Sequence, residues 1–206
     1  YKREPSFPIA VACDPAFNFV YEANIRYLHH LGEVTYFSPL ADTSLPDAGF
    51  VYLPGGYPEL YLAALSANRQ MLQSIRRYVE SGGKLLAECG GMMYLCDEIR
   101  DKNGYVYPMA GVLHQSATME NMKLRLGYRT LLYNETRLKG HEFHYSRLVE
   151  QQNPLPSCAV AYTAKGVETD TPLYHYKNVW AGYTHLYWAD PVGNEWFTKF
   201  VIDGNT

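Results

Sequence analysis

The chain has 206 residues, of which 47% are hydrophobic, and its formal net charge is -3. This length suits one globular domain with a substantial core, and no apolar run approaches the roughly 20 residues that span a bilayer. The charge gives no electrostatic reason to expect nucleic acid or an anionic membrane as a partner. The first residues, YKREPSFPIAVACD, do not resemble a secretory signal, so we expect a cytoplasmic protein.

Four cysteines occur, and they show neither a CxxC pair nor the spacing of a zinc site. A chain of this length and apolar content does not need disulfides to fold. We therefore predict no metal site, and we interpret Cys13, Cys96 and Cys158 as buried structural cysteines. Cys89 stands in a different context, which is described below.

The first half of the chain alternates between strand-like and helix-like segments. Such alternation indicates βαβ units and a parallel sheet that is covered on both faces. The predicted elements are a strand at 7–14, a helix that ends at Gly32, strands at 33–38 and 49–56, helical structure in two pieces at 58–80, a strand at 84–88 and a helix at 91–99.

The second half is rich in strands. Strands are predicted at 107–113, 124–133, 141–149, 159–164 and 179–188, and a terminal helix at 195–202. We expect these strands to continue the first sheet in antiparallel orientation. The chain contains no linker, repeat or low-complexity segment, so residues 1–206 are predicted to form one domain.

The stretch LLAECGGMMYL places Cys89 between a predicted strand and a predicted helix. A strand followed directly by a nucleophile and then a helix is typical of a nucleophile elbow, which lifts the side chain above the carboxyl ends of the strands. Gly90 and Gly91 would provide backbone freedom and room for a substrate. The helix N-terminus would favour negative charge on the sulfur. The alternative is a buried structural cysteine.

A nucleophilic cysteine requires a base and an oxyanion hole. His185 interrupts an otherwise aromatic strand and is the candidate base, although a core histidine bonded to a backbone carbonyl is equally compatible with the pattern. The N–H groups of Gly56 and Gly90 are candidates for the oxyanion hole. The alternative for Gly56 is an ordinary strand-to-helix turn.

Two further histidines, His141 and His144, lie three apart in GHEFHYS on a predicted strand. Residues three apart on a strand face opposite sides, so we do not expect them to bind one metal together. The sequence contains no GxxxxGK[ST] motif and therefore no P-loop for ATP.

Several stretches together resemble one known family. They are IAVACDPAFNFVYEANIRYL, YFSPLADTSLPDA, LPGGYPELY, AECGGMMYL, GHEFHYS and the late HLYW segment, in that order. They are similar to the glutaminase domain of the cobyrinic acid a,c-diamide synthase family, in the cobalamin-synthesis branch of the class I glutamine amidotransferases. The resemblance implies a three-layer, flavodoxin-like α/β fold with a mixed, mostly parallel sheet. It also implies that Cys89 is the nucleophile and that His185 activates it.

The chain departs from the family pattern at two positions. Class I amidotransferases often carry a glutamate two residues after the histidine, and here that position is Tyr187, as expected for the cobalamin branch. The third member of the site stays open, with Asp14 as a weak candidate. Cys13 stands where relatives usually have arginine, so no role is assigned to that position.

The resemblance further implies a division of labour between domains. This chain would hydrolyse glutamine through a cysteine thioester and use no cofactor of its own. An ATP-dependent synthetase domain of the dethiobiotin-synthetase type, with ATP and magnesium, would amidate the a and c carboxylates of a corrinoid. That domain would precede this one in a longer chain or form a separate chain.

Three alternatives remain open. The acceptor could be another tetrapyrrole, such as hydrogenobyrinic acid or a nickel sirohydrochlorin. The chain could be an independent cysteine hydrolase of the γ-glutamyl hydrolase or peptidase type, although GHEFHYS has no obvious role in simple hydrolysis. It could also be a non-catalytic interaction domain, although the presence of both Cys89 and His185 counts against that.

Overall fold

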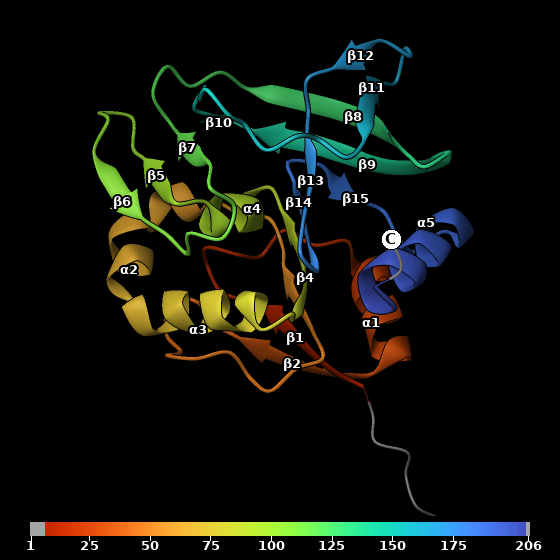
Figure 1. Cartoon of the computed structure of the whole chain (residues 1–206), viewed down its shortest axis with the longest axis horizontal. Helices are drawn as coiled ribbons and strands as arrows, with labels where there is room; N and C mark the ends of the chain where they lie inside the picture. The colour runs from red at the N-terminus through yellow and green to blue at the C-terminus, as the bar shows by residue number, and fades with distance from the viewer. Residues whose placement is uncertain (1–6, 205–206) are drawn as a thin grey trace, which may run out of the picture.

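A six-stranded sheet forms the centre of the structure, a computed structural model that describes residues 7–204 (Figure 1). The first six residues of the N-terminal stretch lie outside this range. The strands follow the order β13-β14-β4-β3-β1-β2. Their bounds are β1 (Pro8–Ala12), β2 (Glu33–Phe37), β3 (Phe50–Leu53), β4 (Lys84–Glu88), β13 (Leu173–Tyr176) and β14 (Val179–Gly182).

Neighbouring strands of this sheet are parallel, except that β13 pairs with β14 in antiparallel orientation. The prediction of a mixed, mostly parallel sheet is therefore confirmed. The carboxyl ends of β3, β4 and β14 meet at one edge of the sheet, because Leu53 pairs with Ala87 and Gly182 pairs with Glu88. Open α/β sheets place their sites at this edge.

Helices cover both faces of the sheet and make it the middle of three layers (Figure 1). Their bounds are α1 (Glu22–Leu31), η1 (Pro58–Leu60), α2 (Leu62–Ala67), α3 (Arg69–Glu80), α4 (Gly90–Leu95), α5 (Pro191–Trp196) and the π-helical η2 (Phe197–Ile202). Successive strand residues point to opposite faces. Val51 and Leu85 accordingly pack with α2, α3 and α4, whereas Phe50 and Leu86 pack with α1, α5 and η2.

Of the strands predicted in the second half, only the first part of 179–188 joins the first sheet, as β14, and it lies parallel to β4. Its antiparallel neighbour β13 was not predicted. The other later strands form two further sheets, so the prediction that they extend the first sheet is wrong for them. One sheet contains β5 (Glu98–Arg100), β6 (Val106–Pro108), β7 (Ser116–Thr118) and β10 (Arg147–Leu148). The other contains β8 (Arg125–Tyr133), β9 (Thr136–His144), β11 (Val160–Thr163), β12 (Glu168–Thr169) and β15 (His185–Leu186). Since β13 covers the outer edge of β14, the later strands pair with one another instead.

Other predicted boundaries also change for physical reasons. The helix predicted at 91–99 ends at Leu95, because residues 98–100 pair with β6 and β7. The strand predicted at 107–113 is short, because Ala110, Gly111 and Val112 donate their N–H groups to the last carbonyls of α4. The predicted strand 179–188 breaks after Gly182, and its second part joins β9.

The ends of two predicted helices have clear causes. Gly32 follows α1 and donates its N–H to the carbonyl of Leu28, as predicted. The terminal helix begins earlier than predicted, because Asp190 caps it by accepting the N–H of Gly193 at 2.7 Å. None of the helices within residues 7–204 has the length and apolar character to cross a membrane.

Candidate active site

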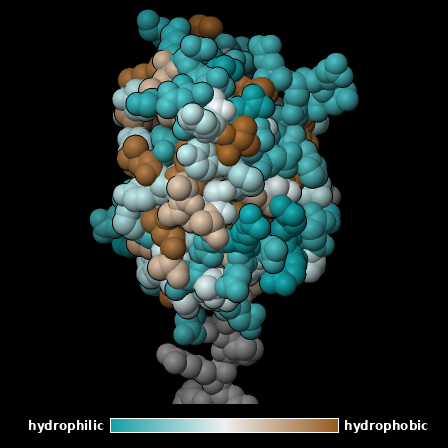
Figure 2. All heavy atoms as spheres, turned by 90° about the vertical axis from the view of Figure 1, so that its left-hand side faces the viewer, coloured by the Kyte–Doolittle hydropathy of each residue, from teal (hydrophilic) through white to brown (hydrophobic). Residues whose placement is uncertain are grey.

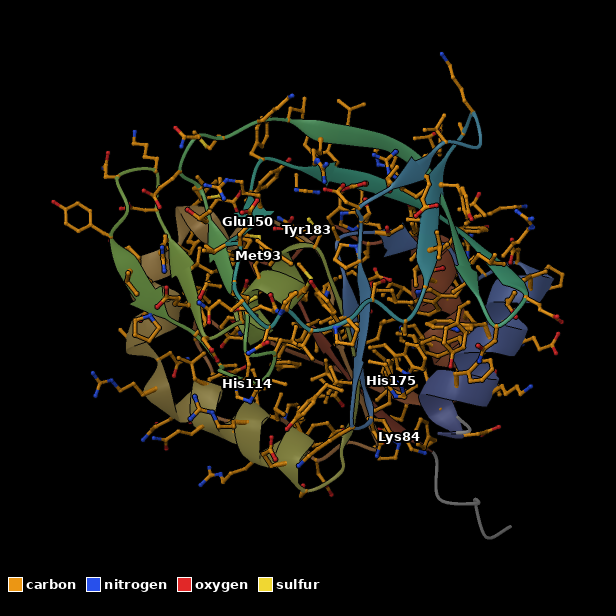
Figure 3. The ribbon with its side chains drawn as sticks, turned by 45° about the horizontal axis from the view of Figure 1, so that its top comes forward. Lys84, Met93, His114, Glu150, His175 and Tyr183 are labelled. Carbon is orange, nitrogen blue, oxygen red and sulfur yellow. The ribbon has the colours of Figure 1, made fainter. Side chains whose placement is uncertain are left out.

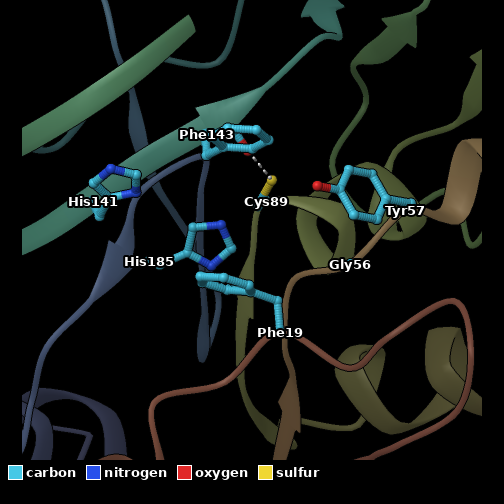
Figure 4. Close-up of a pocket in the computed structure, with 7 residues that line it drawn as sticks. All are labelled: Phe19, Gly56, Tyr57, Cys89, His141, Phe143 and His185. Carbon is cyan, nitrogen blue, oxygen red and sulfur yellow. Dashed lines mark hydrogen bonds between the residues drawn. The ribbon is translucent and has the colours of Figure 1, made fainter. Parts of the chain in front are cut away.

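A small cavity lies where the chain leaves β3, β4 and β14. Its volume is about 180 Å³, which suits a substrate smaller than the drug-sized ligands that fill pockets of about 300–1,000 Å³. Its lining includes Cys89 after β4, Gly56 after β3 and His185 after β14 (Figure 4). Phe19, Tyr57, His141 and Phe143 complete the lining. The structure thus brings the predicted nucleophile, base and one predicted oxyanion glycine to one place.

Cys89 occupies the turn between β4 and α4 with φ 51° and ψ -108°. A positive φ is uncommon for a residue with a Cβ atom and occurs where the surrounding structure imposes it. Two hydrogen bonds hold the turn: Cys89 N–H donates to the Gly182 carbonyl at 2.7 Å, and Met93 N–H donates to the Cys89 carbonyl at 3.0 Å. The local geometry is the predicted nucleophile elbow.

The two glycines after Cys89 serve close packing, not the backbone freedom that we expected, since neither has a positive φ. A Cβ atom on Gly91 would lie 2.1 Å from the Leu53 carbonyl oxygen. A Cβ atom on Gly90 would lie 2.7 Å from Cδ of Pro58. The first turn of α4 can therefore approach the end of β3 only without side chains at these positions.

The thiol of Cys89 is 4% exposed, and its Sγ donates to the carbonyl oxygen of Phe143 at 3.5 Å. Burial raises the pKa of Cys89 well above its usual range, and the nearby carboxylate of Glu59 raises it further, while the Gly90 N–H lowers it. The Gly90 N–H at the start of α4 favours negative charge on the sulfur, as expected, but burial opposes that charge more strongly. Desolvation in this closed pocket outweighs one N–H group and a helix of six residues.

His185 is 3% exposed and lies between the ring of Phe19 and the backbone of Gly55, which follows β3. Its ring centroid is 4.4 Å from that of Phe19 (Figure 4). A Cβ atom on Gly55 would lie 2.2 Å from Cε1 of His185, so only glycine at that position leaves room for the imidazole. Burial, together with the positive charge that His141 and His144 can carry, lowers the pKa of His185 to about 4. The imidazole is therefore neutral near pH 7.

The backbone around His185 is held by groups that are distant in sequence. One carboxylate oxygen of Glu88 accepts the N–H of Leu186 at 3.2 Å, and the other accepts the hydroxyl of Tyr52 at 2.7 Å. The side chain of Asn24 donates to the Leu186 carbonyl at 2.9 Å and accepts the N–H of Trp188 at 3.1 Å. Glu88 directly precedes Cys89, so one carboxylate links the nucleophile strand to the histidine segment.

Glu88 is 2% exposed, and burial raises its pKa to about 7, against the hydrogen bonds that it accepts. Sequence reasoning missed both Glu88 and Gly55. Each leaves a signal in the sequence. Glu88 is a charged residue at the end of a strand that is predicted to be buried on both faces, and Gly55 is the first glycine of the pair after β3. Their roles depend on contacts that no local pattern contains.

Asp14 is not placed to orient His185. One of its carboxylate oxygens accepts the N–H groups of Ala16 and Phe17, and the other accepts the Ser38 hydroxyl and the Leu40 N–H. Within residues 7–204, Nδ1 of His185 is buried without a hydrogen-bond partner. Tyr187 packs edge-on against Tyr21, with ring centroids 5.7 Å apart.

The backbones of Gly56 and Gly90 are adjacent. A Cβ atom on Gly90 would lie 3.2 Å from the Gly56 nitrogen, and one on Gly56 would lie 2.1 Å from the Ala16 carbonyl oxygen. Gly56 has φ +154°, which side-chain-bearing residues rarely adopt. These contacts make a glycine necessary at each position and place the Gly90 backbone directly behind Gly56, which lines the cavity.

The GHEFHYS segment forms β9 and its continuation along this wall. His141 lines the cavity, and His144 is buried on the opposite face of the strand, as predicted. Glu142 accepts hydrogen bonds from Arg129 at 2.5 Å and Thr171 at 2.8 Å, and it pairs with His144 at 2.7 Å. Burial opposes ionisation of Glu142, but these partners outweigh it and lower the pKa to about 2.

A second set of contacts joins this segment to the nucleophile helix. The hydroxyl of Ser146 lies 3.2 Å from Sδ of Met93 and 3.0 Å from the hydroxyl of Tyr183. Met93 and Tyr183 therefore lie close together (Figure 3). His144 stacks on Tyr183 with ring centroids 3.7 Å apart. The motif thus supports the site wall. Its presence does not count against simple hydrolysis, contrary to our expectation.

The other cysteines have three different environments. Cys96 is buried, as predicted, but Cys13 is exposed and Cys158 is only partly buried, so the prediction of burial is wrong for these two. Cys13 directly follows β1, and its N–H still donates to the Phe37 carbonyl at the end of β2, while its side chain is exposed. All four cysteines are free, and residues 7–204 contain no group of three or more His, Cys, Asp or Glu side chains that could hold a metal.

The fold and the elbow define the class of protein: the fold is that of a class I glutamine amidotransferase. A solved glutamine amidotransferase structure superposes with a TM-score of 0.58 at 16% identity, covering 94% of this chain and 98% of the other. At that identity the likeness shows the fold alone. Residues 8–192 match the family described as the CobB/CobQ-like glutamine amidotransferase domain. The chain belongs to this family, as the sequence resemblance predicts.

Curated relatives carry this domain within longer proteins. The hydrogenobyrinate a,c-diamide synthase of Pseudomonas aeruginosa is 40% identical over 185 residues, which are 87% of this chain and 41% of that protein. The cobyrinate a,c-diamide synthase of Fusobacterium nucleatum is 40% identical over 188 residues, with the same coverage of 87% and 41%. The chain therefore spans about two fifths of the length of the relatives that it matches.

Proposed function

We propose that this chain is a glutaminase domain that releases ammonia from glutamine for an amide-forming synthase. One observation carries the proposal: Cys89, on a nucleophile elbow, and His185 line the same small cavity, which also includes Gly56. A buried thiol beside a neutral imidazole and adjacent backbone N–H groups fits acyl transfer through a thioester. Family membership supports the same reaction.

In the first step, the sulfur of Cys89 bonds to the amide carbon of the glutamine side chain. The thiol proton passes to His185, and the N–H groups of Gly56 and Gly90 stabilise the tetrahedral oxyanion. The carbon–nitrogen bond then breaks, and His185 returns the proton to the departing ammonia. This leaves a thioester, which water attacks with His185 as base. Glutamate departs and the thiol is restored.

The surroundings of the site favour the neutral forms of the Cys89 thiol and the His185 imidazole. The Cys89 proton is engaged by the Phe143 carbonyl, and burial disfavours both the thiolate and the imidazolium. Proton transfer therefore costs free energy until a substrate changes the surroundings. Such a site limits the loss of ammonia when no acceptor is ready.

The acceptor is assigned from the relatives. We propose that ammonia passes to an ATP- and magnesium-dependent synthetase domain that amidates the a and c carboxylates of a corrinoid in the cytoplasm. The names of the relatives include both cobyrinate and hydrogenobyrinate, so either tetrapyrrole is compatible. The independent-hydrolase alternative predicts full glutaminase activity without any partner, and the interaction-domain alternative predicts none in any setting.

The test uses the domain together with its synthetase. Cys89→Ala should abolish glutamine-dependent amidation, because loss of an activated nucleophile can cost about 10⁶-fold. The same variant should still amidate with high ammonium chloride, because the activated carboxylate needs only free ammonia. Cys13→Ala, which removes an exposed thiol, is the matched control and should keep both reactions. Retained glutamine-dependent activity in Cys89→Ala would refute the nucleophile.

A further inference from the structure

Glu59 lies beside the cavity, at the point where a second hollow begins. Tyr57 lines both spaces, and the second hollow, about 550 Å³ in volume, also includes Glu59 and Asp101. Pro58, which packs against Gly90, fixes the start of the turn η1 that carries Glu59. On this side of the molecule, where α2, β5 and β6 lie, hydrophobic side chains form small groups among hydrophilic ones (Figure 2).

Three carboxylates act on the Cys89 thiol, and two of them are fully engaged. Glu88 is bonded to Tyr52 and to the Leu186 N–H, as described above. Glu142 is bonded to Arg129, His144 and Thr171. Glu59 differs: its Oε2 atom is buried and has no hydrogen-bond partner, and no salt bridge within residues 7–204 reaches it.

A buried carboxylate oxygen without a partner is costly, and beside a cavity it calls for a binding partner from outside the chain. Burial raises the pKa of Glu59, and the positive charge that His144 can carry offsets this only in part. The ligand should therefore bring positive charge. Of the groups in glutamine, only the α-ammonium does so.

We propose that Glu59 binds the α-ammonium group of the substrate, an inference that rests on the proposed glutaminase reaction. With the side-chain amide carbon at Cys89, four bonds of about 1.5 Å place the ammonium nitrogen about 5 Å from that carbon. Glu59 is near enough for its charge to act on the same sulfur. The residues that line the Cys89 cavity itself include no carboxylate.

This assignment has a consequence for activation of the nucleophile. The negative charge of Glu59 opposes formation of the Cys89 thiolate. A bound ammonium would offset that charge, so the thiol would become easier to deprotonate only when glutamine is present. The substrate would thereby help to activate the residue that attacks it, and an amide without the ammonium would lose both binding and rate.

The experiment compares two substrates and three forms of this chain by ammonia release. The substrates are L-glutamine and 5-amino-5-oxopentanoate, which lacks only the α-ammonium. We expect Glu59→Gln to lower kcat/KM for glutamine roughly 10- to 100-fold, the usual range for one hydrogen bond to a charged group. It should not slow the reaction of the des-amino substrate and should speed it somewhat, because the charge that opposes the Cys89 thiolate is removed and no ammonium is lost. The preference of the native chain for glutamine would then disappear.

Asp101→Asn is the matched control, because Asp101 lines the same hollow but its Oδ1 accepts the N–H groups of Asn103 and Tyr105. It should keep the preference for glutamine. An equal loss with both substrates in Glu59→Gln would assign Glu59 a structural role and overturn the inference. Absence of glutamine hydrolysis in the native chain, alone and with its synthetase, would instead refute the proposed function.

A second measurement needs no substrate. Iodoacetamide reacts with the thiolate, so the rate of Cys89 alkylation at pH 8 reports how readily the thiol ionises. Glu59→Gln removes a negative charge and should increase this rate several-fold, whereas a variant with a disturbed fold would also expose the buried Cys96. An unchanged or slower rate at Cys89 would overturn the electrostatic role of Glu59.

Discussion

The Cys89 corner and the segment around His185 face the same cavity but are built in opposite ways. The corner is local: β4 ends at Glu88, Cys89 turns the chain, and α4 begins at the next residue. The His185 segment is assembled from distant parts of the chain, with Asn24 on one side and β9 on the other. A nucleophile can thus be specified by one short stretch, whereas its base depends on several elements packing together.

The two regions meet at Gly55 and at Glu88. Gly55 gives His185 the space that it occupies next to β3. Glu88 is the last residue of β4, directly before Cys89, and it accepts the N–H of Leu186, the residue after His185. Substitution of Gly55 should therefore disturb the histidine and spare the cysteine, whereas the charge of Glu88 also acts on the Cys89 thiol.

The largest effect is expected for Gly55→Ala. The new methyl group would lie 2.2 Å from Cε1 of His185 and force the imidazole away from its place. A displacement of about 1 Å can cost about 100-fold in rate, and we expect at least that loss of glutaminase activity. Alkylation of Cys89 by iodoacetamide should continue at the native rate. Equal losses of glutaminase activity and of the Cys89 alkylation rate would show that the Cys89 corner depends on the histidine segment.

A smaller effect, on stability, is expected for Glu88→Gln. The pKa of Glu88 is raised from 4.5 to about 7 in the folded chain, so between these values the folded state binds the proton more tightly than the unfolded state. The stabilisation is complete below about pH 4.5 and is lost as pH rises through about 7. Its total size is about 3 kcal/mol, from about 1.4 kcal/mol for each pKa unit.

Chemical denaturation from pH 4.5 to 7.5 measures how the stabilisation by Glu88 changes with pH. The free energy of unfolding of the native chain, minus that of Glu88→Gln, should decrease across the range, because glutamine does not titrate. Glu168→Gln, at an exposed position in β12, should show no such trend. A difference that increases with pH would have the wrong sign for a buried, protonated carboxyl group.

The smallest change is a shift in the pH dependence of the reaction. Since His185 must be neutral to accept a proton, kcat/KM should decrease as pH falls through about 4, not through the usual histidine value of 6.5. Steady-state rates between pH 3.5 and 8, with tryptophan fluorescence as a check on folding, provide the measurement. An acid limb near pH 6.5 would mean that His185 is solvated during the reaction.

Much of the first half could be predicted from the sequence, because its signals are local. The apolar runs of β1, β3 and β4 end at polar or glycine residues, and the helices end at Gly32 and at Gly82-Gly83. The second half could be predicted only as a set of strands. Their partners are chosen by which edges are free, and sequence periodicity does not encode which sheet a strand joins.

The sequence by itself determined the nucleophile elbow, the succession of strands and helices up to α4, and the family to which the chain belongs. The tertiary structure decided which residues surround the cysteine and the histidine, and in what charge state. Desolvation outweighs the effect expected from the helix N-terminus on Cys89, and it keeps His185 neutral. Burial is a property of the whole packed molecule, so no short stretch of residues can reveal it.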